Sequence, residues 1–154
     1  MTDEPTATAP IATETSTSEA QAYIDDMAQK RGYVLDYHKV MAKNDFRVLQ
    51  AANGVVSAAY LEQRLLDRKT KELIFIVSLT VMRASKGHIQ SHIRVALDLG
   101  LSPAEILEAI EISLPEAGIV AFQAGVEAWR EVVAADSIEP SVSVFEGGSG
   151  ASRA

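Results

Sequence analysis

The chain has 154 residues, of which 47% are hydrophobic and none is cysteine, and its formal net charge is −7. This size and composition predict one globular domain with an apolar core, and the lack of cysteine excludes disulfides, zinc–thiolate sites and thiol redox chemistry. The acidic balance and the absence of a basic stripe argue against nucleic acid as a partner.

The two ends of the chain differ in composition from the middle. Residues 1–17 are rich in Thr, Ser, Ala and Glu, and residues 140–154 end in a run rich in Gly and Ser. Such segments bury too little apolar surface to offset the entropy lost on ordering. We therefore expect flexible tails at 1–17 and 140–154 around one domain at 18–139.

No segment has the features of a secretion signal or a membrane span. The first residues lack the basic and apolar regions of a secretory signal. The longest apolar run, at 73–82, is about half of the roughly 20 residues that cross a bilayer. We expect a soluble, cytoplasmic protein that does not bind membranes.

The first part of the domain predicts helices with short breaks between them. Ser18 and Gln21 form a capping-box pattern for a helix at about 19–31, and Gly32 is placed to end it. A short helical turn is expected to follow at about 37–43.

Two longer apolar patterns come next. Asn44 or Asp45 can cap a helix in which apolar residues recur at helical spacing over 46–60. Asp67 can cap a helix at about 68–82 that is apolar almost all round, which is typical of a central, buried helix. The β-branched residues of this segment also suit a buried strand, but its length favours a helix.

The last part of the domain carries the strongest boundary signal. Ser85 is placed to cap a helix that stops near Gly100, and the sequence Ser-Pro-Ala-Glu at 102–105 combines an N-cap, an N1 proline and an N3 glutamate. Pro115 is expected to end that helix, and a final helix is expected over 116–135. The sequence therefore predicts an all-α domain of about six helices.

Two of the three histidines, His88 and His92, lie four residues apart on the helix that starts near Ser85. Positions i and i+4 project from the same helix face, so both imidazoles can act on one proton or one ion. They flank the apolar stripe of the helix, so we expect them in a cleft or an interface. Alternatively, each is a buried side chain bonded to a backbone carbonyl, the structural role expected for His38.

Two carboxylates are candidates to join the histidines. Glu72 stands at the head of the most apolar helix, and Glu116 follows the break at Pro115. In apolar surroundings a carboxyl group has a raised pKa and can act as an acid or base near neutral pH. Alternatively, Glu72 is exposed and pairs with Arg68 or Lys69, and Glu116 only compensates a helix dipole.

The same four side chains, those of His88, His92, Glu72 and Glu116, could instead hold a divalent metal ion. The glutamate that accompanies such a histidine pair in metalloproteases would stand at position 89, which is Ile89. A zinc protease is therefore not expected.

Several segments together resemble the carboxymuconolactone decarboxylase and alkylhydroperoxidase D (AhpD-like) family: residues 66–74, the pair His88 and His92, and residues 96–100 and 102–106. The resemblance covers about residues 30–133. It implies an all-α, AhpD-like domain that forms a homo-oligomer, either a trimer or a hexamer.

Peroxidatic members of that family carry the motif C-x-x-C-x-x-x-H, and counting back from His92 places Ser85 and His88 where the two cysteines stand. The dithiol peroxidase mechanism needs both thiols and is therefore excluded. Members of the decarboxylase type keep a glutamate and the final histidine, which match Glu72 and His92. Their Tyr-x-Gly-x-Pro pattern is replaced here by the sequence at 116–120, a departure that bears on the substrate γ-carboxymuconolactone.

The resemblance implies a cofactor-free lyase for a small carboxylated lactone or oxo acid of aromatic catabolism. In this hypothesis His92 is the general acid or base at the carbon that loses CO2, His88 assists it, and Glu72 orients the imidazole. Glu116 adds a second carboxylate near the family's pocket.

Two residues are candidates for binding the substrate. Arg83 could bind its carboxylate, because a guanidinium matches the geometry of that group, and Ser85 stands at the start of the histidine helix. Alternatively, Arg83 is a solvated charge at the end of a buried helix. Two other functions fit the same site: a metal-binding protein or metal-dependent enzyme, and a non-catalytic oligomer that binds a small ligand.

Overall fold

The computed structural model describes residues 17–136, in which it contains eight α-helices, one π-helical turn and no strand. The prediction of an all-α fold is therefore confirmed for this range. The predicted tails lie, apart from Thr17, outside the described residues. Within the described range no helix has both the length and the apolar character that a membrane crossing requires.

The elements follow one another with short connections. In chain order they are α1 (Thr17–Arg31), α2 (Asp36–Asn44), α3 (Phe46–Val56), η1 (Ser57–Leu61), α4 (Arg68–Val81), α5 (Lys86–Asp98), α6 (Pro103–Glu111), α7 (Ser113–Ala117) and α8 (Ile119–Asp136).

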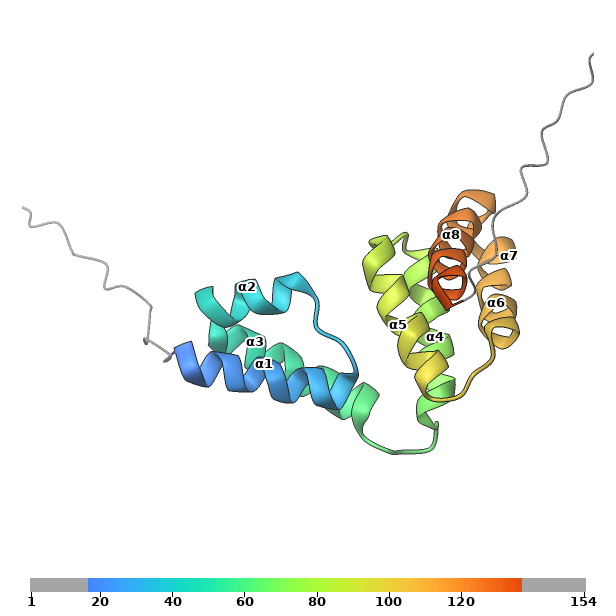
Figure 1. Cartoon of the computed structure of the whole chain (residues 1–154). Helices are drawn as coiled ribbons and strands as arrows, with labels where there is room; N and C mark the ends of the chain where they lie inside the picture. The colour runs from blue at the N-terminus through green and yellow to red at the C-terminus, as the bar shows by residue number, and fades with distance from the viewer. Residues whose placement is uncertain (1–16, 137–154) are drawn as a thin grey trace, which may run out of the picture.

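The helices form two groups, α1–α3 and α4–α8, each built around its own apolar core (Figure 1). In the first group the buried apolar residues include Ile24, Met27 and Leu49. In the second group α4 lies at the centre, packed against α5, α6, α7 and α8, as its apolar sequence predicts. The two groups meet where η1 leads into α4, and this junction positions the polar side chains described below.

Several predicted helix boundaries are confirmed. The side chain of Asp67 accepts a hydrogen bond from the backbone N–H of Thr70 at 2.7 Å, which caps α4. The capping box of α6 is formed as predicted. Gly32 and Gly100 both have φ of +85°, a conformation that favours glycine and ends α1 and α5.

The N-terminal boundaries differ in detail from the prediction. α1 begins at Thr17, so Ser18 is the second residue of the helix and not its N-cap. The segment predicted as a short turn near 37–43 is the full helix α2. Asn44 is the last residue of α2, and Asp45 alone caps α3, accepting a bond from Val48 N–H.

The region around Pro115 also differs from the prediction. α6 already ends at Glu111, and Pro115 lies in the first turn of the separate helix α7, where the missing N–H of proline costs nothing. Gly118, with φ of +80°, then ends α7, so the final helix begins at Ile119 and not at Glu116. With α2 and α7 counted, the described chain has eight α-helices instead of about six.

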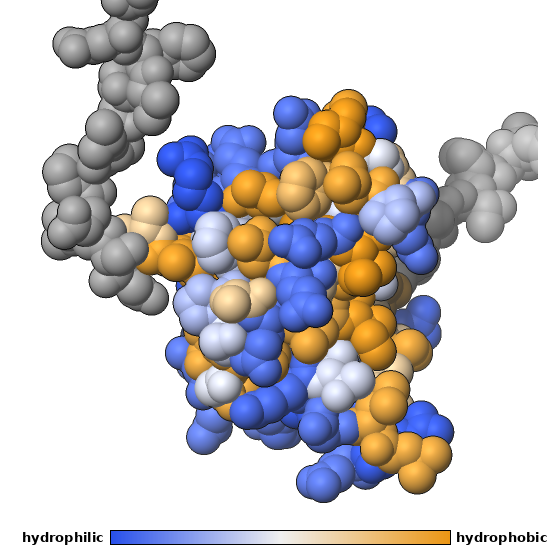
Figure 2. Space-filling model, turned by 90° about the vertical axis from the view of Figure 1, so that its right-hand side faces the viewer, coloured by the Kyte–Doolittle hydropathy of each residue, from blue (hydrophilic) through white to orange (hydrophobic). Residues whose placement is uncertain are grey.

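Large apolar side chains remain exposed on the surface. Figure 2 shows them in patches between charged residues on the face that carries α6–α8. In and around α7, four such residues are exposed: Ile112, Leu114, Ile119 and Val120. Leu65, in the segment between η1 and α4, is fully exposed. Surface of this kind is typical of proteins that associate.

Gly125 allows α8 to approach α4 and α6 closely. A Cβ atom at this position would lie 2.6 Å from Thr80 Cγ2 and 2.8 Å from Ile110 Cγ2. Both neighbours are fully buried, so neither can move aside into solvent. A side chain at position 125 would therefore push the helices apart.

We expect Gly125→Ala to lower the free energy of unfolding by about 1–3 kcal/mol through overpacking, measured by urea denaturation followed by circular dichroism. Gly54→Ala is the matched control, because Gly54 also lies within a helix but its added Cβ meets no atom within 4 Å. There alanine is expected to raise stability by about 0.5–1 kcal/mol. Equal effects of the two substitutions would contradict this account of the packing.

Candidate active site

Glu72 and His92 form a fully buried pair between the two central helices. Glu72 lies in the first half of α4 and His92 in the middle of α5, and both side chains have no exposed area. Glu72 Oε2 and His92 Nδ1 are 2.7 Å apart, which is a hydrogen bond. The buried face of α4 that was predicted from its apolar sequence thus contains one carboxylate.

The other oxygen of Glu72 is also occupied. Oε1 accepts hydrogen bonds from the hydroxyl of Tyr60 and, at 2.8 Å, from Arg68 Nε. Arg68 also donates to the Tyr60 hydroxyl at 2.8 Å, and its guanidinium lies 4.0 Å from the centre of the Tyr60 ring. Burial acts to raise the pKa of Glu72, but the hydrogen bonds from His92, Tyr60 and Arg68 outweigh it and lower that pKa below its usual value. Glu72 is therefore a carboxylate at neutral pH.

The second nitrogen of His92 faces a hydroxyl. His92 Nε2 lies 3.1 Å from the hydroxyl oxygen of Tyr33, which is in the segment after α1. Phe75, one turn after Glu72, stacks on the imidazole with ring centres 4.8 Å apart and an interplanar angle of 6°. Because Glu72 is ionised, Nδ1 carries the proton of the neutral ring, and Nε2 accepts from Tyr33; this tautomer follows from the hydrogen-bond pattern.

His88 lies one turn before His92 and is half-buried, with the two ring centres 5.4 Å apart. Burial, and secondarily the neighbouring His92, lowers the pKa of His88, so its ring is neutral at pH 7. His88 lines a cavity of ≈ 400 Å³ between the segment after α1 and the start of α5; the other lining residues are Val34, Leu35, Asp36, Tyr37, Ser85 and Gly87. The ring of His88 lies beside that of Tyr33, with the two ring centres 6.4 Å apart, so His88 connects this cavity to the residues around His92.

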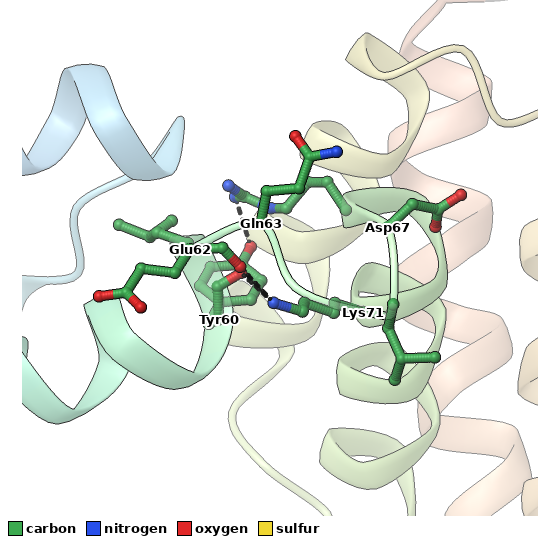
Figure 3. A pocket seen from close by; sticks show the side chains of 8 residues that line it. Tyr60, Glu62, Gln63, Asp67 and Lys71 are labelled. Atoms are coloured by element: carbon green, nitrogen blue, oxygen red, sulfur yellow. Dashed lines mark hydrogen bonds between the residues drawn. The ribbon is translucent and has the colours of Figure 1, made fainter.

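A second, smaller cavity of ≈ 230 Å³ lies at the Glu72 end of the network, beside Tyr60 and Arg68 (Figure 3). Lys71 points across it toward the end of η1 and donates to the backbone oxygens of Tyr60 at 3.3 Å and Glu62 at 2.7 Å. The charge of Lys71 is thus used to cap η1. The two cavities lie at opposite ends of the Glu72–His92 pair.

The structure brings together only part of the predicted site. Glu72, His92 and His88 are close to one another, whereas Glu116 is exposed on α7. Arg83 is also exposed, just beyond the end of α4, with φ of +53°. Ser85 lines the larger cavity but makes no capping hydrogen bond to α5.

The four-residue polar cluster expected from the sequence is not formed in this protein. Among the described residues, no three His, Asp or Glu side chains are grouped so that they could hold a metal ion. Both nitrogens of His92 already have hydrogen-bond partners, Glu72 and Tyr33. Within the described range, the four side chains therefore do not form the metal site that was considered as an alternative from the sequence.

Sequence analysis missed two residues that contact the pair, Tyr33 and Tyr60. Tyr33 is 59 positions from His92 in the sequence, and no local motif connects them. Tyr60 was recognised only as an apolar position of its helix. Arg68 was considered as a partner of an exposed Glu72, and it does pair with Glu72, but in a buried site.

His38 has the structural position that was expected of it. It is 1% exposed, and its Nδ1 accepts a hydrogen bond from the backbone N–H of Leu35 at 3.0 Å. Its Nε2 lies 3.3 Å from Nη1 of the buried Arg31. His38 therefore belongs to the same junction as Tyr33.

In a comparison with protein-family models, residues 47–131 match the model of the carboxymuconolactone decarboxylase family. This match spans more than half of the 154-residue chain. The chain belongs to the carboxymuconolactone decarboxylase family. A comparison with curated proteins found no match, and neither did a comparison with solved structures.

The match to the carboxymuconolactone decarboxylase model begins after Tyr33, which it does not include. It does include the other residues of the site: Tyr60, Arg68, Glu72, His88 and His92. Because the chain contains no cysteine, it cannot use the dithiol peroxidase chemistry of AhpD-like relatives. The matched range thus contains both members of the buried Glu72–His92 pair.

His38 is expected to make stability depend on pH. Burial first, and the positive charge of Arg31 second, lowers the pKa of His38 to about 4. Between that value and the usual pKa of about 6.5, the unfolded chain binds more protons than the folded one, so stability falls as the pH falls.

The stability lost between about pH 6.5 and pH 4 from this group is on the order of 3 kcal/mol. Urea denaturation of the wild type and of His38→Gln, at several pH values across this range, measures it. The variant is expected to show a flatter pH dependence. Parallel curves for the two proteins would show that His38 contributes nothing to the pH dependence.

Proposed function

We propose that the protein is a carboxy-lyase that uses Glu72, His92 and Tyr33 for acid–base catalysis on a small carboxylated lactone or oxo acid. The observation that supports this most is the continuous hydrogen-bonded chain from a buried carboxylate, through a buried imidazole, to a hydroxyl. A carboxylate on one ring nitrogen orients the imidazole and stabilises its protonated form. Membership of the carboxymuconolactone decarboxylase family supports the same reaction class.

In this proposal Tyr33 relays protons between His92 and the ligand. Burial raises the pKa of Tyr33, with Arg31 acting in the opposite direction, so the hydroxyl keeps its proton until an acceptor is present. Its oxygen is within hydrogen-bond distance of His92 Nε2, so once that nitrogen has been protonated, Tyr33 can receive its proton while it donates its own.

The proposed reaction consumes one proton. The bond between the carboxylate carbon and the adjacent carbon of the substrate breaks, and CO2 leaves. The electron pair of that bond passes into the conjugated carbonyl group to give an enolate. His92 first takes up a proton from solvent at Nε2 and becomes an imidazolium that Glu72 stabilises. Tyr33 then donates its proton to the enolate carbon as this imidazolium re-protonates Tyr33. His92 is then neutral again, the proton taken from solvent is the one consumed, and Glu72 remains ionised throughout.

The larger cavity is the proposed substrate site. It is lined by His88 and Ser85, and the ring of His88 lies beside that of Tyr33 with ring centres 6.4 Å apart. His88 is neutral at pH 7, so it can either accept or donate a hydrogen bond to the substrate and assist His92 without adding a charge. A cavity of ≈ 400 Å³ fits a small organic acid.

We also propose that the protein forms a homo-oligomer, either a trimer or a hexamer. The support is the exposed apolar surface around α7 and at Leu65. Monomeric soluble proteins seldom expose contiguous apolar patches of large area, because such patches drive association.

Assays of CO2 release from carboxylated lactones and oxo acids test the proposed reaction. We expect His92→Ala to lower kcat by about 10²–10⁴-fold, since general acid–base catalysis contributes a factor of this size. Tyr33→Phe is expected to lower kcat as well, because it removes the relay hydroxyl but keeps the ring. Glu108→Ala, on the exposed side of α6, is the control and is expected to be unaffected.

Equal rates for the wild type and His92→Ala would remove His92 from the mechanism. A rate that falls on treatment with a chelator and returns with a divalent metal ion would favour the metal hypothesis. Binding of these acids without any CO2 release would favour a non-catalytic, ligand-binding oligomer.

Sedimentation equilibrium tests the proposed oligomer, for which we expect three or six times the chain mass of 16.6 kDa. Leu65→Ser is expected to weaken association without unfolding the chain, because Leu65 is fully exposed in the single chain. Gln63→Ser, two residues away and also exposed, is the matched control. A mass of one chain at micromolar concentration would contradict the proposal.

A further inference from the structure

Arg31 is a buried cation that has no carboxylate partner within the described part of the chain. It ends α1, and its side chain is 4% exposed. None of the ion pairs formed in residues 17–136 includes Arg31. A buried charge without a counter-ion is costly, because the water that solvated it has been lost.

The Arg31 guanidinium also has more hydrogen-bond donors than acceptors around it. One donor is accepted by Asn53 Oδ1, whose amide is oriented by its own bond to the hydroxyl of Tyr23 at 2.7 Å. The Nε donor of Arg31 is buried and has no partner.

His38, which also lies beside the Arg31 guanidinium, does not supply the missing hydrogen-bond acceptor. Its Nδ1 accepts the N–H of Leu35, so the hydrogen-bond pattern assigns the proton of the neutral ring to Nε2. That Nε2 lies 3.3 Å from Arg31 Nη1, so a donor faces a donor. Among the guanidinium nitrogens, Nε is therefore buried without a partner, and His38 does not supply a good acceptor for Nη1.

The charges of the junction do not balance either. Arg68 donates from one guanidinium nitrogen to the backbone oxygen of Arg31 at 3.1 Å, so two cations share this region. Glu72 is the carboxylate that pairs with Arg68, and its two oxygens are already bonded to His92, Tyr60 and Arg68. The junction therefore has one positive charge in excess.

Arg31, with its unbalanced charge and unpartnered donor, lies close to the hydrogen-bonded chain of Glu72, His92 and Tyr33. The positive charge of Arg31 acts to lower the pKa of Tyr33, and the Tyr33 hydroxyl is 3.1 Å from His92 Nε2. Leu35 lines the larger cavity, its backbone N–H is bonded to His38, and His38 Nε2 lies 3.3 Å from Arg31 Nη1, so two contacts connect this cavity to Arg31.

We propose that Arg31 binds a carboxylate group of the ligand that occupies the site beside Tyr33 and His92. A carboxylate supplies the single missing negative charge, and its two coplanar oxygens match the fork of a guanidinium. Arg31 would then determine specificity for carboxylate ligands, the role that sequence analysis considered for Arg83. The inference deepens the proposed function, on which it rests for the place of the ligand.

NMR of the wild-type protein labelled with ¹⁵N-arginine tests this without any substitution. The Nε–H resonance of Arg31 is assigned through its own backbone amide, and the protein is titrated with sodium acetate against sodium chloride at constant ionic strength. We expect a saturable downfield shift of this resonance with acetate, and none with acetamide. No saturable shift, an equal shift with chloride, or a shift confined to Arg83 would overturn the proposal.

Substitutions give a second measurement. Acetate is expected to raise the Tm of the wild type and of Arg83→Gln to the same extent, and to raise the Tm of Arg31→Lys much less, with at least tenfold weaker binding. Lysine keeps the charge but cannot present the fork, so the variant separates carboxylate recognition from charge alone. Tighter binding of inorganic phosphate than of acetate would also overturn the assignment.

These outcomes are distinct from those of the proposed reaction. Acetate binding at Arg31 in a protein that releases no CO2 from any acid would leave this assignment intact and remove the lyase. CO2 release that depends on His92 but is insensitive to acetate and to Arg31→Lys would leave the lyase intact and remove the assignment of Arg31.

Discussion

The buried hydrogen bond between Glu72 and His92 is the constraint on which the rest of this structure depends. A carboxylate without exposed area is tolerated only when its oxygens are satisfied, and here the partners come from different segments: His92 from α5, Tyr60 from η1 and Arg68 from the first turn of α4. Removal of one partner of such a buried pair typically costs about 3–5 kcal/mol, so each of these segments is held in place by Glu72.

The same network joins two groups of helices that have separate apolar cores. Arg68 reaches back to the end of α1, and Tyr33 reaches forward to α5, so the contacts across the junction are largely polar and directional. Apolar packing tolerates small shifts, whereas hydrogen bonds to an imidazole require defined angles and distances. This junction therefore sets the position of the His92 imidazole more narrowly than either core would.

Much of the fold and the centre of the site could be predicted from local sequence. The caps at Asp67 and at 102–105 and the apolar character of the central helix follow short-range rules, and these predictions were confirmed. The pairing of Glu72 with His92 was a hypothesis that came from spacing and resemblance, and the two side chains are in contact. The break at Pro115 was misplaced because proline is equally suited to the first turn of a new helix.

The remaining parts of the site depend on long-range packing. Tyr33 and Tyr60 have no motif of their own, and their role arises only when α1–η1 meets α4 and α5. Conversely, Glu116 had a suggestive place in the sequence, but its side chain is exposed on α7 and does not join the pair. Charge and position along the chain cannot reveal such outcomes, because they are decided by which helix faces come together.

The division into two cores has a consequence for how the hydrogen-bonded chain of the site comes apart. Stability in proteins is distributed over units that open separately, and regions with few buried apolar contacts open at the lowest cost in free energy. Here the hydroxyl beside His92 Nε2 belongs to one group of helices and the imidazole to the other. An opening between the two groups would break the contact between Tyr33 and His92 while both apolar cores stay folded.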